Sequence, residues 1–232
     1  MLIIADNRLP DNAKHKLEHY GEIMFLETGG IVYDSISGHP DIFFCQLGNQ
    51  LVIAPNLPEK YKHLLKDKKF SFIEGEIPLG KKYPQTAVYN VVCTTDFLIH
   101  NFRYTDSMIT YAADERDLIH VNQGYTRCNL MPVAPNSFIT SDKGIERVLE
   151  KYATNVLYVN PAEIQLPGAN HGFFGGCCGL YKGKLFIAGS LSFFTDGEKV
   201  KLFAGQCDLE IIELFDGPLF DCGSIMFVDQ SG

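Results

Sequence analysis

The chain has 232 residues, of which 46% are hydrophobic and 21% charged, and its formal net charge at pH 7 is −8. These values are typical of a globular protein that is long enough to bury a sizeable core. The acidic balance argues against a nucleic-acid partner, because the phosphate backbone is bound by clustered lysine and arginine. No apolar stretch approaches the roughly 18–20 residues that span a bilayer, so we expect no membrane partner either.

The first ten residues, "MLIIADNRLP", contain a short apolar run and no basic region, so they do not resemble a signal peptide. We therefore expect a cytoplasmic protein. The number of cysteines is odd and their spacing irregular, which indicates reduced thiols, most of them small buried side chains. The seven cysteines are Cys45, Cys93, Cys128, Cys177, Cys178, Cys207 and Cys222.

We expect no metal site and no cofactor. No pair of cysteines has the C-x-x-C spacing of structural zinc sites. The stretch "HKLEH", His15 to His19, matches the H-x-x-E-H pattern of one metalloprotease class. It lies on a short predicted helix at the outside of the molecule, and no segment that could supply a third ligand is visible, so we interpret it as a helix surface.

A four-residue apolar run recurs five times, at intervals of 40 to 49 residues. The first residues of these runs are Leu2, Leu51, Phe97, Ser137 and Leu185. Each run is followed by a loop rich in turn-forming residues, and then by a segment with helical spacing of its apolar side chains. A second short strand follows the helix, and a further apolar segment precedes the next run.

The predicted helices are 11–20, 58–67, 106–116, 142–152 and 197–206, with Asp106 and Ser141 as expected N-caps. The strands expected after them are 22–27, 70–75, 117–123, 155–161 and 208–214. The further apolar segments, also predicted as strands, are 41–47, 86–92, 124–133, 172–181 and 223–228.

Five units of strand, strand, helix and strand, with a period of about 46 residues, indicate an internal repeat. The chain begins with the second strand of a unit and ends with a first strand, so the last strand completes the first unit. This arrangement favours a closed ring over a linear array, which would need capping repeats at its ends. We therefore predict one α/β domain, residues 1–232, built as a five-fold pseudosymmetric α/β propeller with strands inside and helices outside.

Five such units in a ring resemble the pentein, or guanidine-modifying-enzyme, superfamily. Within it, "GYTRCN…SFITSDKGI" and "GFFGGCCG" are most similar to a bacterial family of unknown function that is assigned to this fold. The resemblance implies the pentein fold, and for the enzymes of the superfamily it implies hydrolysis or transfer of amidino groups. Those enzymes use a cysteine on the first strand of the last unit, a histidine on that of an earlier unit, and carboxylates that hold the guanidinium. Other members are not enzymes.

The sequence departs from that catalytic pattern in two units. In the last unit, Ile225 and Met226 occupy the middle of the strand, and Cys222 lies a few residues early. In the fourth unit, Gly175, Gly176 and Cys177 stand where a histidine and a carboxylate would be expected.

The stretch "NHGFFGGCCG", 170–179, carries the densest set of candidates. His171 lies in a loop that we expect at the mouth of the ring, and it could act as acid and base for a thiol. Cys177 and Cys178 would face opposite ways on a strand, so that one lines the channel and the other enters the core. The glycines allow close packing of strands at the ring axis, or could expose backbone N–H groups to an anion.

The candidate catalytic residues are therefore Cys177, His171 and Cys222. The candidate ligand-binding residues are Asn170, Arg127, Cys128, Asp221, Ser224 and two acids expected to be exposed beside the inner strands, Asp6 and Asp96. An arginine in the channel repels a guanidinium and suits an anionic group, whereas the enzymes need carboxylates there.

Two functions remain open. The first, which the missing strand cysteine and channel acids favour, is a non-catalytic or divergent pentein that binds a small polar ligand in the central channel. The alternative is a cysteine-dependent hydrolase or amidinotransferase-like enzyme acting on a guanidino or other C–N substrate. A protein partner or a homo-oligomer also remains open.

Overall fold

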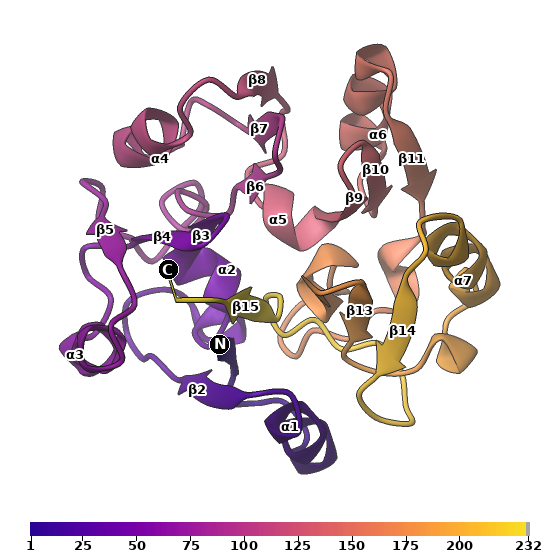
Figure 1. Cartoon of the computed structure of the whole chain (residues 1–232), viewed down its shortest axis with the longest axis horizontal. Helices are drawn as coiled ribbons and strands as arrows, with labels where there is room; N and C mark the ends of the chain where they lie inside the picture. The colour runs from indigo at the N-terminus through magenta and orange to yellow at the C-terminus, as the bar shows by residue number, and fades with distance from the viewer. Residues whose placement is uncertain (231–232) are drawn as a thin grey trace.

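The computed structural model describes residues 1–230, which form five three-stranded sheets. Figure 1 shows the sheets distributed around a common centre, with the longer helices at the periphery. The first two sheets are β15 (Met226–Val228), β1 (Leu2–Asp6) and β2 (Glu22–Leu26), and β3 (Phe44–Leu47), β4 (Gln50–Ile53) and β5 (Phe72–Glu74). The others are β6 (Val92–Cys93), β7 (Phe97–His100) and β8 (Asp117–His120); β9 (Leu130–Ala134), β10 (Ser137–Thr140) and β11 (Asn155–Tyr158); and β12 (Cys178–Tyr181), β13 (Lys184–Ile187) and β14 (Glu210–Glu213).

All five sheets have the same topology. The first two strands are antiparallel, and the second and third are parallel. A parallel pair needs a crossover, which the peripheral helices provide. These helices are α1 (Asp11–Glu18), α3 (Glu59–Asp67), α4 (Ser107–Ala112), α6 (Lys143–Leu149) and α7 (Gly197–Gln206). None of the helices within residues 1–230 is both long and apolar enough to cross a bilayer.

The two chain ends meet in one sheet. Strand β15 pairs with β1 antiparallel, with Val228 opposite Leu2 and Met226 opposite Ile4. Both termini accordingly lie close together in Figure 1. The expectation that the last strand completes the first repeat is confirmed.

The predicted helices and outer strands are present; α7 has the predicted bounds, and the others are shorter than predicted. Asp106 caps α4 as expected, since its side chain accepts a hydrogen bond from the Met108 amide. The expected cap at Ser141 is wrong by one position: Asp142 accepts from the amides of Gly144 and Ile145. Ser141 is instead turned inward, where its hydroxyl donates to Asn129 Oδ1.

The inner strands are shorter than predicted, because a helical turn precedes three of them. These turns are α2 (Pro40–Phe43), α5 (Thr126–Asn129) and the 3₁₀ turn η4 (Gly175–Cys177). The remaining short turns are η1 (Asp34–Ile36), η2 (Glu150–Tyr152), η3 (Pro161–Glu163) and η5 (Leu191–Phe193). The expectation that Cys177 and Cys178 alternate on a strand is therefore wrong: Cys177 ends a turn, and both side chains are fully buried in one apolar cluster.

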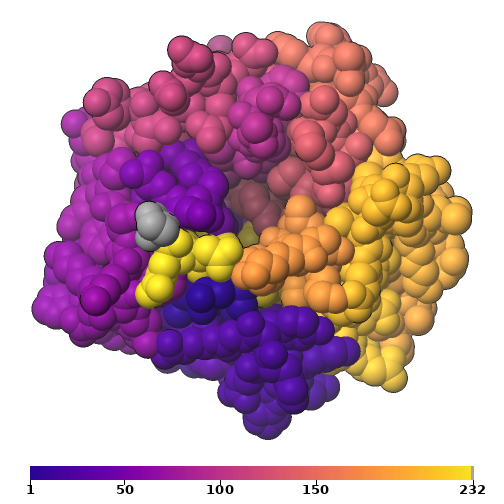
Figure 2. Space-filling model, viewed as in Figure 1, coloured from indigo at the N-terminus to yellow at the C-terminus, as the bar shows by residue number. Residues whose placement is uncertain are grey.

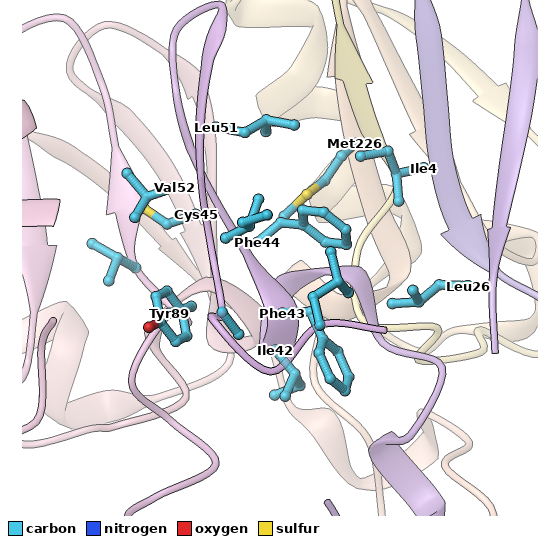
Figure 3. Close-up of a cluster of buried hydrophobic side chains, with 14 of the residues drawn as sticks. Ile4, Leu26, Ile42, Phe43, Phe44, Cys45, Leu51, Val52, Tyr89 and Met226 are labelled. Atoms are coloured by element: carbon cyan, nitrogen blue, oxygen red, sulfur yellow. The ribbon is translucent and has the colours of Figure 1, made fainter. Parts of the chain in front are cut away.

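The largest part of the core lies under the first two sheets, where β1, β3 and β4 converge. Figure 3 shows the Phe44 ring beside Met226, the Phe43 ring beside Ile42, and Tyr89 on the opposite side of the cluster. Because Phe43 belongs to α2 and Phe44 begins β3, this packing anchors the turn that precedes the strand. The turns at the molecular centre are thus held by buried apolar side chains on either side.

Candidate functional site

A group of polar side chains is buried where the segments that precede the inner strands converge. We call it the central cluster. It consists of Asp6, His39, Asp41, Asn90, Cys128, Asp221 and Ser224, each with 4% or less of its surface exposed. Asp6 ends β1, His39 and Asp41 begin α2, and Cys128 lies in α5, while the others come from the loops before β6 and β15. Four of the five repeats therefore contribute to it.

Asp41 is the main acceptor of the central cluster. Its Oδ2 accepts hydrogen bonds from Ser224 Oγ at 2.6 Å and from Cys128 Sγ at 3.2 Å. Asn90 Nδ2 donates to the same sulfur at 3.2 Å and to the Asp41 carbonyl at 3.0 Å. The segments that precede β3, β6, β9 and β15 are thereby connected through one carboxylate and one thiol.

His39 lies between two further carboxylates. Its Nδ1 is 3.9 Å from Asp221 Oδ1, and its Nε2 is 3.9 Å from Asp6 Oδ2. Arg8 is hydrogen-bonded to both carboxylate oxygens of Asp6. Asp221 accepts from the Phe173 and Gly223 amides, yet its burial raises the pKa of this carboxyl. Burial without full pairing disfavours the charged form of an acid.

Two glycines leave room for the central cluster. A Cβ on Gly176 would lie 2.0 Å from Asp221 Oδ1, and one on Gly223 would lie 2.1 Å from His39 Cβ. Gly223 also has a φ of +66°, which a residue with a side chain rarely adopts. Because neither position carries a side chain, the backbone at Gly176 packs against Asp221 and the backbone at Gly223 packs against His39. Asp221 Oδ1 then lies 3.9 Å from His39 Nδ1.

The three candidate thiols are all buried and all donate to oxygen. Cys128 donates to Asp41 Oδ2, Cys177 to the Phe173 carbonyl at 3.3 Å, and Cys222 to the Gly176 carbonyl at 3.4 Å. Burial raises the pKa of each thiol well above its ordinary value, and nearby aspartates raise it further. The reactive thiolate form is therefore disfavoured at all three positions.

A separate open cavity of ≈ 730 Å³ lies at the other end of the inner strands. Its walls come from the ends of the inner strands and the turns that follow them, in all five sheets, and include Asn49, Thr95, Pro135, Lys182 and Asp229. Figure 2 shows a hollow near the centre of this face, beside the yellow C-terminal segment.

Arg127 lies at the inner end of this cavity. Its guanidinium donates to the carbonyls of Gly175 at 2.9 Å and Cys178 at 3.2 Å, near the start of β12. Two hydrogen bonds use only part of its five N–H donors, so donors remain for a bound group.

The structure separates the predicted site residues into three groups. Asp6, Cys128, Asp221 and Ser224 meet in the central cluster, next to Cys222 and Cys177. The expectation that Asp6 is exposed is wrong, because β1 is covered on both faces and Arg8 pairs with the carboxylate. Arg127 lies apart, in the open cavity.

The remaining candidates lie outside both sites. Asn170 is exposed, and His171 is half-buried with its ring packed against Phe173 and its Nδ1 2.9 Å from the Gly172 carbonyl. Asp96 is exposed in the turn between β6 and β7. The structure thus gives His171 no thiol partner among the contacts of the described residues.

His39, Asp41 and Asn90 were not among the residues predicted from the sequence. A signal was available, because "GHPD" at 38–41 and "VYN" at 88–90 precede inner strands as "TRCN" at 126–129 does. The shared position of these segments before inner strands points to the centre of the ring, but it does not show which of their side chains meet there.

Residues 4–226 match the family described as "Family of unknown function (DUF6873)". No curated protein matches the sequence.

Solved structures do match in fold, at low sequence identity. SxtG, an amidinotransferase from Microseira wollei, is 13% identical with a TM-score of 0.55, covering 100% of this chain and 94% of its own. An agmatine deiminase from C. jejuni is 11% identical with a TM-score of 0.58, covering 100% and 81%. A DDAH from Pseudomonas aeruginosa complexed with citrulline is 10% identical with a TM-score of 0.54, covering 91% of each chain. The resemblance to the pentein superfamily is confirmed at the level of fold.

Proposed function

We propose that this protein, which belongs to the Family of unknown function (DUF6873), is a non-catalytic pentein whose sheets close into a propeller around a ligand-binding channel. The ligand is a small polar molecule with an anionic group, held in the open cavity. The observation that carries this proposal is the Arg127 guanidinium at the inner end of a cavity bordered by all five sheets. A guanidinium pairs with a carboxylate or phosphate in two parallel hydrogen bonds.

The cavity has the size and lining of a small-molecule site. Its volume of ≈ 730 Å³ lies within the range of about 300–1,000 Å³ that such sites span. Apolar side chains such as Val133, Leu180 and Phe227 supply contact area, while Gln46 and Thr94 offer hydrogen bonds. These features suit a ligand with an apolar body and one charged end.

The state of the thiols supports a binding role over a catalytic one. A cysteine nucleophile must be a thiolate within reach of substrate. Cys128, Cys177 and Cys222 are buried, have raised pKa values and do not line the open cavity.

Thermal unfolding with a panel of small carboxylates tests the proposal, because a ligand that binds only the native state raises the melting temperature. We expect at least one carboxylate to raise it, and the matching neutral amide to leave it unchanged. Arg127→Gln should abolish the rise. Arg103→Gln, which changes an exposed arginine outside the cavity, should retain it. A rise that persists in Arg127→Gln would contradict the assigned role of this side chain.

A second candidate is a cysteine-dependent reaction on a guanidino compound, and one observation favours it. A ring nitrogen of His39 lies within 4.8 Å of Cys128 Sγ, beside the carboxylate of Asp41. Attack of the thiolate on the guanidinium carbon, departure of the amine with a proton from His39, and hydrolysis by water would yield a ureido product. This chemistry requires the central cluster to open, since all three side chains are buried.

Incubation with agmatine and assay of ureido product and ammonia would test this candidate. Turnover that disappears in Cys128→Ser and persists in Cys207→Ser would replace the binding proposal with the catalytic one.

A further inference from the structure

The central cluster contains side-chain atoms that nothing in the protein satisfies. Within residues 1–230, three buried side-chain nitrogen or oxygen atoms have no hydrogen-bond partner, namely Nδ1 and Nε2 of His39 and Oδ1 of Asp41. His39 is 1% exposed and Asp41 fully buried, so bulk water does not reach them. An unsatisfied buried polar group is costly, and three in one place require an explanation. A bound cation that accepts a lone pair from one imidazole nitrogen and one from Asp41 Oδ1 would satisfy two of the three atoms.

The geometry points to a metal ion: we propose that His39, Asp41 and Cys128 bind a divalent transition metal, with zinc as the best fit. One donor atom from each residue lies within 4.8 Å of the other two. Imidazole nitrogen, carboxylate oxygen and thiolate sulfur are the three donor types of protein zinc sites. The sulfur disfavours magnesium and calcium, which prefer oxygen ligands.

The charge of the central cluster also favours a bound cation. Asp6, Asp41 and Asp221 bring three carboxylates together, and of these only Asp6 has an arginine partner, Arg8. In the part of the chain that the structure describes, no lysine or arginine forms an ion pair with Asp41 or Asp221. Buried charges in proteins are normally paired or coordinate a metal. A divalent ion bound by Asp41 would offset the charge of this unpaired carboxylate.

The groups around the three ligands have the positions that support metal ligands elsewhere. A ligating histidine normally donates its other ring N–H to a carboxylate, and ligating sulfur is oriented by hydrogen bonds. Whichever nitrogen of His39 binds the ion, a carboxylate lies 3.9 Å from the other, since Asp221 faces Nδ1 and Asp6 faces Nε2. Asn90 Nδ2 donates to Cys128 Sγ at 3.2 Å.

The proposed metal site does not depend on the proposed ligand in the open cavity. Arg127 and Cys128 are adjacent in α5, but Arg127 lines the cavity whereas Cys128 contacts Asp41. A protein without metal could still bind a carboxylate through Arg127, and a protein without a carboxylate ligand could still hold zinc.

Metal analysis and cobalt substitution of the purified full-length chain test the proposal. We expect about one zinc ion per chain after exposure to zinc and gel filtration, because the described residues contain one such His–Asp–Cys group. Replacement by Co²⁺ should produce the sulfur-to-cobalt charge-transfer band of a thiolate ligand, together with intense visible bands of a tetrahedral ion. A protein that binds neither ion, or binds cobalt without the charge-transfer band, would overturn the proposal.

Matched variants identify the ligands. Cys128→Ala should abolish the charge-transfer band, and the near-isosteric Asp41→Asn and His39→Gln should each weaken zinc binding by at least about tenfold. Cys45→Ala, which removes a buried thiol outside the central cluster, should retain the band.

The double variant His15→Gln/His19→Gln tests the surface "HKLEH" pattern on α1 and should also retain full zinc binding. Circular dichroism checks that each variant is folded. A band that persists in folded Cys128→Ala, or zinc binding that is lost in His15→Gln/His19→Gln, would overturn the proposal.

Discussion

The Ser224 hydroxyl donates a hydrogen bond of 2.6 Å to Asp41 Oδ2, although the two residues lie 183 positions apart in the chain. Ser224 belongs to the loop before β15, and Asp41 to the turn before β3. The contact joins the first sheet, in which β15 pairs with β1, to the second sheet at the molecular centre.

Loss of this hydroxyl should destabilise the protein measurably. Ser224→Ala removes a donor from a fully buried carboxylate, and we expect a loss of about 1–3 kcal/mol in the free energy of unfolding. Urea denaturation measures it. Ser107→Ala is the control, because Ser107 also donates to a carboxylate, that of Glu76, but at the surface. Its effect should stay within about 0.5 kcal/mol. Equal losses in both variants would contradict the importance of the buried contact.

Two glycine-to-alanine substitutions should have opposite effects on stability. A Cβ on Gly176 would overlap Asp221 Oδ1, and overpacking of this kind costs about 1–3 kcal/mol. Gly205 lies exposed in α7 with nothing within 4 Å of an added Cβ. Gly205→Ala should therefore stabilise by about 0.5–1 kcal/mol, because alanine favours the helix. Thermal unfolding of both variants checks the signs, and stabilisation by Gly176→Ala would be inconsistent with the packing described.

Stability should fall below neutral pH because of His100. This side chain is fully buried between Thr105 Oγ1 and the Gly124 carbonyl, and burial lowers its pKa from 6.5 to about 4. Between these two pH values the unfolded chain binds a proton that the folded chain does not. The contribution is therefore fully present above pH 6.5 and is lost as pH falls toward 4, by on the order of 3 kcal/mol.

Urea denaturation at several pH values, in the wild type and in His100→Gln, isolates this contribution from that of the carboxylates. The variant should show a smaller loss of stability between neutral and mildly acidic pH. Identical pH profiles would show that His100 is not the group responsible.

The seven thiols should differ strongly in their rates of alkylation. Cys93 and Cys207 are half-buried beside the open cavity, and burial raises the pKa of Cys93. The other five thiols, Cys45, Cys128, Cys177, Cys178 and Cys222, are buried. We expect iodoacetamide to modify Cys207 first and the five buried thiols only after unfolding, because only an accessible thiolate reacts. Peptide mapping after brief alkylation measures the order. Fast modification of Cys128 in the native protein would favour the catalytic candidate.

The repeat architecture could be predicted because its signals are local. The apolar run at Leu185 and the strand predicted at 208–214 have local signals, and the strand is present as β14 at Glu210–Glu213. The helix predicted at 197–206 had a weaker pattern, yet α7 has the same bounds. The pattern occurs five times, and only the first copy lacks its first strand. The strand at the end of the chain was therefore expected to fill that place, and β15 does pair with β1.

The centre of the molecule was decided by tertiary structure. "GHPD" reads as a turn, and nothing local to it indicates that His39 and Asp41 face Cys128, Asp221 and Ser224 from other repeats. Likewise, "NHGFFGGCCG" reads as a reactive strand, yet its glycines accommodate Asp221 and the backbone of α5. Periodicity reports which face of a segment is buried. Which polar groups share that buried space depends on how five separate turns converge, and only the folded chain determines this.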